Sequence, residues 1–446
     1  MIFKRTLKTT AIIFLLIILS GCNTSKDSVS TVESKESLTD EQWIEDIEYL
    51  EEKLPRILAK EIYNTLEEEG FSKGITQLKE RVSELQDYEI KYELTKLIAK
   101  SGEGHTRLDN QLYEEEKRYP LETYWFGDEL RLVKTDKRKK ELIGKELLSI
   151  NDISVDEIVK RMDSIISHDT NQWVKSQSRR YILRPKALKF LDITKEDTIK
   201  VKFKDEEKGV LEVDMTPQKI ESDNMVSIKD IMEEKSIQYR RDTRADMKDN
   251  PNFYWYKYIK EDKILYLQYN KCMDKSIVHE SVEEYTKSIP DIKKFSNRLV
   301  DYINNNDVER LIVDLRFNQG GYTRITHTLV LKLKEVNKLR GRIFIITGKN
   351  TFSAGVKAAA TFKEELGATS VGEATGENVN FYASGLKLIL PNSKIGIMCS
   401  NVYMPSYANY PRNFIPNVAV EQSFKNYLKG IDDAYEEIKK LDIIEW

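Results

Sequence analysis

Apolar residues recur at helical spacing in the first part of the chain that follows residue 38. The segment Thr39-Asp40-Glu41-Gln42 offers a helix cap with acidic residues in the first turn, and the apolar side chains after it share one face. The same period predicts three further helices, over Ile57 to Glu69, Ile75 to Leu85 and Tyr88 to Ile98. We therefore expect a small helical bundle over residues 39–118.

The pattern changes between Tyr119 and about Ser222 to short runs in which apolar and polar residues alternate. Runs such as Glu129 to Val133 and Ile199 to Phe203 are typical of strands with one buried face, and a single helix over Val155 to Ile166 interrupts them. The strand and turn of Leu142 to Asp152, together with the helix that follows, resemble the middle of a PDZ domain. A β-rich, PDZ-like domain is expected over residues 119–222.

From Phe253 onward, buried strands and amphipathic helices alternate, which predicts an α/β core with crossover connections over residues 223–446. Later strands, at Leu386 to Leu390 and Ile395 to Met398, are expected to complete its sheet, and a last helix covers Gly430 to Leu441. The expected core strands are Ile264 to Tyr269, Leu311 to Leu315 and Ile343 to Thr347, and the expected helices are Ile289 to Asn304, Thr326 to Val336 and Ala354 to Leu366.

The first residues have the pattern of an export signal. A cationic start with Lys4, Arg5 and Lys8 precedes the apolar run Ala11 to Leu19, which is too short to cross a bilayer as a mature helix. Leu19-Ser20-Gly21-Cys22 then resembles a bacterial lipobox, in which the thiol is acylated and the peptide is cut before it. We expect a signal peptide over residues 1–21, a lipid on Cys22 and a flexible tether over residues 22–38, which make the protein extracytoplasmic and membrane-anchored. The alternative is a short membrane anchor with an incidental cysteine.

Composition narrows the classes of partner. Charged residues make up 33% of the chain, yet the net charge is only −3, which argues against nucleic acid as the main partner. Besides Cys22 the chain has only Cys272 and Cys399, so a disulfide framework is not expected, although one bridge stays open. Two buried thiols that act as small hydrophobic side chains are the favoured interpretation.

A buried strand that ends in two glycines is the first candidate for chemistry. Leu311 to Leu315 leads into Arg316-Phe317-Asn318-Gln319-Gly320-Gly321, where glycine leaves backbone N–H groups open to a ligand. The spacing and the missing Lys-Ser/Thr ending exclude a phosphate-binding loop. A donor nest for an oxyanion fits better, and a plain strand-to-helix turn is the structural alternative.

Ser353 is the second candidate. It follows the apolar strand Ile343 to Thr347 and opens a helix rich in alanine, where backbone N–H groups and the helix dipole favour developing negative charge. On this evidence alone Ser353 is either a nucleophile or an ordinary N-cap.

Together these segments resemble the serine peptidase family of the carboxyl-terminal processing (tail-specific) proteases and the tricorn core. The resemblance rests on the Asp-Leu-Arg-x-Asn-x-Gly-Gly strand end, on Ser-Ala at the helix start, and on the later segments Gly372 to Gly376, Leu390 to Ser393, Ile415 to Val418 and Gly430 to Ala434. It implies a ClpP/crotonase-like core, Ser353 as nucleophile, and an oxyanion hole formed by Ala354 with Gly320 or Gly321. No spacing of His, Cys and Asp residues resembles a metal site, so we expect no metal, and no cofactor is expected either.

One departure from the family concerns the general base. The position of the lysine in lysine-dyad members is Asn378 here, and Lys387 belongs to a strand. The tricorn-like branch uses a histidine in an Asp-Gly-His-Thr loop, and Gly104-His105-Thr106 matches that loop with Glu103 in place of the aspartate. His105 is therefore the expected base, with a solvated loop histidine as the alternative. The residue that orients His105 is not identified from the sequence.

The function expected from these residues is hydrolysis of peptide bonds in exported proteins or peptides. A catalytically inactive relative that binds a peptide or partner in the same cleft is the main alternative, and a solute-binding lipoprotein is a weaker one. Nothing in the sequence sets the preferred side chain of the substrate or the oligomeric state.

Overall fold

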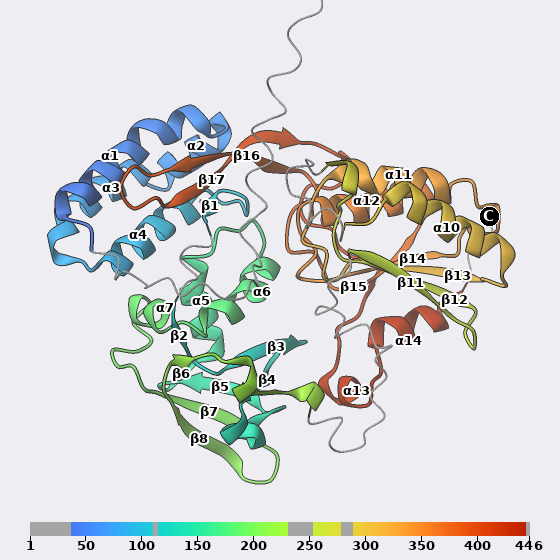
Figure 1. Ribbon diagram of the computed structural model, residues 1–446, viewed down its shortest axis with the longest axis horizontal. Coiled ribbons are helices and arrows are strands. Elements are labelled where there is room, and N and C mark those ends of the chain that lie inside the picture. The colour runs from blue at the N-terminus through green and yellow to red at the C-terminus, as the bar shows by residue number, and fades with distance from the viewer. Residues whose placement is uncertain (1–36, 110–114, 231–252, 278–288, 443–446) are drawn as a thin grey trace, which may run out of the picture.

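A computed structural model describes residues 37–109, 115–230, 253–277 and 289–442 (Figure 1). The expected signal peptide, Cys22 and nearly all of the expected tether lie outside these residues. Within the described ranges, no helix combines the length and the apolar character that a membrane span needs.

Four helices form the N-terminal unit, as the apolar period predicted. The first begins at a capping box in which Thr39 and Gln42 satisfy each other's backbone N–H, and it buries Trp43, Ile47 and Leu50. The four are α1 (Asp40–Ile57), α2 (Lys60–Glu68), α3 (Phe71–Arg81) and α4 (Asp87–Ala99).

These helices do not close on themselves but cover a three-stranded sheet whose longer strands come from the far end of the chain (Figure 1). Strand β17 (Gly396–Met404) pairs with β16 (Phe381–Ile389) on one side and with β1 (Arg107–Leu108) on the other. We expected these late strands to complete the core sheet, and that expectation was wrong. Leu388, Leu390, Ile395 and Ile397 instead pack against the apolar faces of the N-terminal helices.

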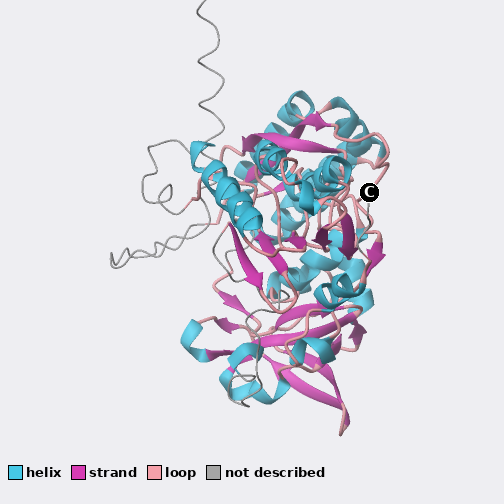
Figure 2. Ribbon diagram, turned by 90° about the vertical axis from the view of Figure 1, so that its right-hand side faces the viewer, coloured by secondary structure: helices cyan, strands magenta, loops and turns pink. Residues whose placement is uncertain are grey.

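The middle of the chain forms a separate, largely antiparallel sheet, which makes up the lower end of the molecule in Figure 2. The order of its main path is β10-β4-β5-β7-β8, with β3 and β6 paired at its sides, and β2 (Lys117–Arg118) pairs with β9 (Gln218–Lys219). Its strands are β3 (Glu122–Phe126), β4 (Glu129–Asp136), β5 (Glu146–Ile150), β6 (Ile153–Ser154), β7 (Ile199–Asp205), β8 (Gly209–Met215) and β10 (Met225–Ser227). The PDZ-like character of this region stays a prediction.

Three helices, not the single one expected, accompany this sheet: α5 (Val155–Asp163), α6 (Asn171–Tyr181) and α7 (Pro185–Phe190). The sequence hides α6 because its buried face is largely polar. Ser176, Gln177 and Ser178 are all buried, and the Ser176 hydroxyl donates to Asn350 Oδ1 at 2.6 Å. The regular spacing of apolar residues, which predicts most helices, does not reveal α6, because α6 packs against a polar surface of the C-terminal region.

The C-terminal region has the predicted alternation of strands and helices. Its six-stranded sheet has the order β11-β12-β13-β14-β15-β18, with parallel pairing from β12 onward. The strands are β11 (Tyr254–Ile259), β12 (Ile264–Tyr269), β13 (Arg310–Asp314), β14 (Ile343–Thr347), β15 (Thr369–Gly372) and β18 (Val418–Ala419), and the helices are α10 (Ile292–Asn305), α11 (Thr323–Leu333), α12 (Ala354–Leu366), α13 (Phe424–Leu428) and α14 (Asp433–Lys440).

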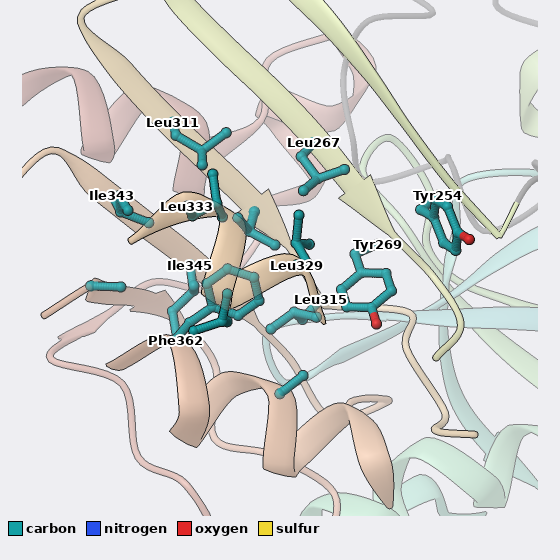
Figure 3. Close-up of a cluster of buried hydrophobic side chains, with 14 of the residues drawn as sticks. Tyr254, Leu267, Tyr269, Leu311, Leu315, Leu329, Leu333, Ile343, Ile345 and Phe362 are labelled. Carbon is teal, nitrogen blue, oxygen red and sulfur yellow. The ribbon is translucent and has the colours of Figure 1, made fainter. Parts of the chain in front are cut away.

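The main core lies between this sheet and three of its helices. Figure 3 shows strand residues such as Leu311 and Ile345 facing Leu329 of α11 and Phe362 of α12. Helix α14 packs on the other face through Tyr435 and its neighbours. The ClpP/crotonase-like assignment itself stays a prediction. The fold brings the carboxyl ends of β13 and β14 side by side, so the loops that follow them meet at one edge of the sheet.

Candidate active site

Ser353 lies at the first turn of α12 in a backbone conformation that L-residues seldom adopt. Its φ is 56° and its ψ is −128°, and its side chain makes no capping hydrogen bond. The ordinary N-cap interpretation is therefore wrong for this serine. Such a conformation costs about 1 to 3 kcal/mol and is typical of residues whose position serves a site. The Ser353 hydroxyl points instead to His105, whose Nε2 lies 3.0 Å from Oγ.

His105 is enclosed rather than solvated. It is only 8% exposed, and its ring packs against two phenylalanine rings, with centroids 4.9 Å from Phe352 and 5.1 Å from Phe381. Gly104 makes this packing possible, because a Cβ there would lie 2.7 Å from Cζ of Phe352. The alternative of a solvated loop histidine is therefore wrong.

Glu103 fixes the backbone of the loop that carries the histidine. Its carboxylate accepts the N–H of His105 at 2.7 Å and also the N–H of Thr106. The Thr106 hydroxyl accepts the N–H of Ser400 on β17 at 3.2 Å, and the next residues pair with the same strand as β1. Because β17 is the strand that joins the N-terminal helices to the C-terminal region, this pairing sets the position of the histidine loop relative to Ser353.

Glu377 is the residue that the sequence did not identify. Its Oε1 lies 2.7 Å from Nδ1 of His105, and its Oε2 accepts the N–H of Ser353 at 2.6 Å. The Nδ1 contact is close but poorly aligned, since neither atom makes a hydrogen bond of regular geometry. Looser geometry of this kind is common before a substrate is bound. The available signal was positional, because Glu377 directly precedes Asn378, the position inspected for a lysine base.

A second carboxylate and a helix of the middle region support the turn that carries Glu377. Asp169 Oδ2 accepts the N–H of Asn378 at 2.9 Å, and the Thr170 hydroxyl donates to the carbonyl of Gly376 at 2.7 Å. From the adjoining α6, Trp173 stacks on Phe352 with ring centroids 4.1 Å apart. The site is therefore assembled from the N-terminal, middle and C-terminal regions together.

Burial shifts the pKa values of His105, Glu377 and Asp169 in the direction that favours the uncharged form of each group. Burial lowers the pKa of His105 to about 4, so the imidazole is neutral at neutral pH and can accept a proton. Burial raises the pKa of Glu377 well above its usual range. Burial, followed by the nearby Glu377 charge, raises the pKa of Asp169 to about 8. Each shift disfavours an isolated charge in this enclosed cluster.

The glycine loop after β13 lies against the serine. A Cβ on Gly320, whose φ is 105°, would lie 2.6 Å from Cβ of Ser353. The Gly320 N–H is already engaged, since it donates to Asn318 Oδ1 at 2.9 Å. Neither Gly321 nor Ala354 donates its N–H to any partner in the described residues, and both residues line the same cleft as Ser353.

The Asp-Leu-Arg part of the same loop has a structural role. Arg316 Nη2 lies 2.6 Å from Oδ2 of the buried Asp314, and the same guanidinium pairs with Asp432. Asp432 in turn caps α14 by accepting the N–H groups of Ala434 and Tyr435, both at 3.1 Å. The motif thus connects the segment before the glycine loop to the start of α14 through the ion pair between Arg316 and Asp432.

Ser353 and His105 open into a cleft of about 690 Å³, to which Gly321 and Ala354 also contribute. Among the other histidines, His168 and His327 lie beside Asp163 and Glu365 and do not line this cleft, and His279 lies outside the described residues. Cys272 and Cys399 are buried free thiols, as expected, and burial raises the pKa of both. The described segments contain no group of three His, Cys, Asp or Glu side chains placed to hold a metal ion.

Solved structures share the fold of this chain. Mature CPAF in complex with lactacystin aligns with 90% of this chain and 97% of its own, with a TM-score of 0.61 and 12% identity. Mature CPAF alone aligns with 90% of this chain and 96% of its own, with a TM-score of 0.58 and the same 12% identity. The tricorn protease aligns with 90% of this chain but only 36% of its own at 12% identity, and its TM-score of 0.41 is too low to show a common fold. No protein-family profile and no curated protein sequence matches the chain.

Proposed function

We propose that this protein is a serine peptidase in which Ser353 is the nucleophile, His105 the general base and Glu377 the carboxylate that orients the base. The observation that carries the proposal is the chain of contacts from Glu377 Oε1 through the imidazole to Ser353 Oγ, at 2.7 Å and 3.0 Å. Such an order of acid, imidazole and hydroxyl has one clear chemical use, which is to remove the hydroxyl proton as the oxygen attacks.

The first half of the reaction forms a bond between the enzyme and the substrate. Ser353 Oγ attacks the carbonyl carbon of the scissile peptide bond while its proton passes to Nε2 of His105. The imidazolium that forms is stabilised by the carboxylate of Glu377 at Nδ1. The electron pair of the carbonyl moves to its oxygen, and in this proposal the N–H groups of Gly321 and Ala354 donate to it.

Collapse of this intermediate breaks the C–N bond, and the proton on Nε2 goes to the departing amine. The acyl group is then bonded to Ser353. Water repeats the sequence, losing its proton to His105 as it attacks, and Ser353 regains a proton when the acid product leaves. All proton transfers thus run through Nε2, which a neutral His105 leaves free to accept.

The strained backbone of Ser353 favours an active enzyme over an inactive relative. A binding protein has no need for a serine held at a φ of 56° with its hydroxyl against an enclosed imidazole. Two unengaged N–H groups next to that hydroxyl also have a purpose in acyl transfer that simple binding does not supply.

A fluorophosphonate probe tests the proposal without knowledge of the substrate. The probe should modify the wild-type protein at Ser353, as identified by mass spectrometry of the labelled peptide. Ser353→Ala should remain unlabelled, while Ser296→Ala, which removes a buried hydroxyl on α10, serves as a matched control that keeps labelling. Equal labelling of Ser353→Ala, or none of the wild type, would contradict the assignment. Lactacystin, the ligand in one of the CPAF structures, offers a second probe.

We further propose that a lipid on Cys22 anchors the enzyme outside the cytoplasm, where its substrates are exported proteins or peptides. The lipobox-like segment Leu19 to Cys22 after a short apolar run supports this. Growth with an alkyne fatty acid should label the wild-type protein but not Cys22→Ala, and the variant should leave the membrane fraction. Labelling that persists in Cys22→Ala would refute the anchor.

A further inference from the structure

The cleft beside Ser353 is lined by three arginines and by no acidic side chain within the described residues. They are Arg107, Arg180 and Arg324, which come from β1, α6 and α11. These elements belong to three different regions of the chain, so the positive lining is a property of the assembled cleft. The sequence as a whole is slightly acidic, with a net charge of −3, and the cleft therefore differs in sign from the rest of the molecule.

None of the three guanidinium groups has a carboxylate partner in the described part of the chain. Arg107 donates from Nη1 to the carbonyl of Gly104 at 3.0 Å, while the side chains of Arg180 and Arg324 make no hydrogen bond or ion pair there. Elsewhere in the protein, by contrast, Arg131 and Arg161 lie beside carboxylates at 2.8 Å and 3.0 Å. The cleft thus holds guanidinium groups that are available to an incoming anion.

Helix geometry adds to the positive potential of the cleft. Arg324 is the second residue of α11, where a cation is unfavourable for the helix because the N-terminal end of the dipole is itself positive. The first turns of α11 and α12 contain no acidic residue, and the first residues of both helices line the cleft. An arginine at this position weakens its own helix, and an anionic ligand would offset that cost.

We propose that the cleft selects peptide segments with Asp or Glu side chains near the scissile bond. This inference rests on the proposed peptidase function and names its substrate class. Carboxylates match guanidinium groups in charge and in paired hydrogen-bond geometry. The remaining lining is partly apolar, with Trp173, Phe352 and Phe381 among it, which suits the aliphatic and backbone parts of a peptide.

The test compares peptides that differ only in the charge of one side chain. Each labelled peptide carries either Glu or Gln at one position near the bond that the wild type cleaves. If the wild type cleaves none of the peptides, every position along the peptide is varied in this way. Binding to Ser353→Ala is measured by fluorescence anisotropy. Each peptide is made with a free and with an amidated C-terminus, so that preference for a side-chain carboxylate is separated from preference for a chain end. The Glu peptides should bind about fivefold more tightly per effective position, and the preference should shrink as salt is added.

Arginine variants connect that preference to the cleft. Arg180→Gln and Arg324→Gln, made in the Ser353→Ala background, should each reduce the Glu-to-Gln ratio toward one, and the double variant should remove it. Arg340→Gln, which alters an exposed arginine away from the cleft, should leave the ratio unchanged. Arg107 is kept, because its contact with Gly104 supports the His105 loop. Thermal unfolding of each variant verifies that it is folded.

The results separate this inference from the proposed function. A wild type that is labelled by fluorophosphonate but binds Glu and Gln peptides equally retains the peptidase function and overturns the acidic preference. A preference that depends only on the free C-terminus, or that persists in the double arginine variant, also overturns it. Glu-selective binding that is lost with Arg180 and Arg324 supports the inference, even if the labelling experiment were to refute catalysis.

Discussion

Glu377→Gln removes a carboxylate from the proposed site while keeping its shape. In the wild type each oxygen faces a different donor position, Oε1 the Nδ1 atom of His105 at 2.7 Å and Oε2 the N–H of Ser353 at 2.6 Å. A glutamine side chain has one acceptor oxygen and one NH₂ group, so it can accept from only one of these two groups. The structure therefore leaves the variant with two arrangements.

In the first arrangement the glutamine oxygen keeps the Ser353 N–H and the NH₂ group faces Nδ1. Nδ1 then becomes an acceptor, the ring proton moves to Nε2, and no lone pair is left to receive the serine proton. In the second arrangement the NH₂ group faces the Ser353 N–H, and two buried donors oppose each other at a cost of about 1 to 3 kcal/mol. A change of imidazole tautomer costs less, so the first arrangement dominates and the rate should fall by about 10⁴-fold.

Stability should respond in the opposite way. Burial raises the pKa of Glu377 above the ordinary value of 4.5, so ionising the carboxylate that orients His105 costs the folded state more than it costs the unfolded state as pH rises. The wild type consequently loses stability above that pH, whereas glutamine has no proton to release. At pH 8 the free energy of unfolding of the variant should equal or exceed that of the wild type.

The assay pairs a rate with a stability measurement. The rate constant for fluorophosphonate labelling of Ser353 is measured by stopped labelling and gel fluorescence, and unfolding is followed in urea at pH 5 and pH 8. Glu335→Gln, which removes an exposed carboxylate paired with Lys332, is the matched control and should change neither quantity. A labelling rate within about tenfold of the wild type would falsify the orienting role of Glu377.

Further predictions concern the packing at Gly320, the protonation of His105 and the burial of Asp169 in the same site. Gly320→Ala should slow labelling by at least about 100-fold, because the added Cβ would meet Ser353 Cβ at 2.6 Å, and labelling near the wild-type rate would show that the loop gives way. Burial lowers the pKa of His105 from 6.5 to about 4, so the imidazole remains neutral at pH 5.5. The labelling rate should therefore stay on its plateau from neutral pH down to pH 5.5. A rate that has fallen to half of its maximum at pH 6.5 or above would contradict this. Burial raises the pKa of Asp169 from 3.8 to about 8, so the stability of the wild type falls as pH rises through that window. Asp169→Asn should make the free energy of unfolding at pH 8 higher by several kcal/mol, because each pH unit between the two pKa values corresponds to about 1.4 kcal/mol, with little change at pH 4. Unfolding in urea measures this, and equal pH dependence in both proteins would be the contrary result.

Local patterns were sufficient where a feature depends on neighbours in the chain. The capping box at Thr39 needs only the residues up to Gln42, and the strand leading to Gly320 is recognisable because buried parallel strands are continuously apolar. The turn that presents Ser353 is encoded in the same way, by an apolar strand followed by small residues at a helix start. The position of His105 in a glycine loop was likewise readable from a few residues.

The assignment of β16 and β17 shows where such reasoning fails. Their alternation predicts strands correctly, but alternation does not state which sheet a strand joins. The partner surface is the apolar face of helices near the other end of the sequence. The N–H of Asn392, for example, donates to Asp46, which lies 346 positions earlier. Helix α6 was missed for a related reason, because the surface it contacts is polar and lies in another region.

What the sequence by itself determined is the set of parts: the strands and helices of the core, the glycine loop, a serine at a helix start and a histidine between small residues. Only the tertiary structure decided which parts meet. It brings His105 to Ser353, which lies 248 positions away in the sequence, and it places the Glu377 carboxylate in contact with both residues. It also places three arginines from separate elements around one cleft. The physical reason is that conformation at a residue depends on its near neighbours, whereas a site depends on packing between surfaces that are distant in sequence, and no local period encodes that packing.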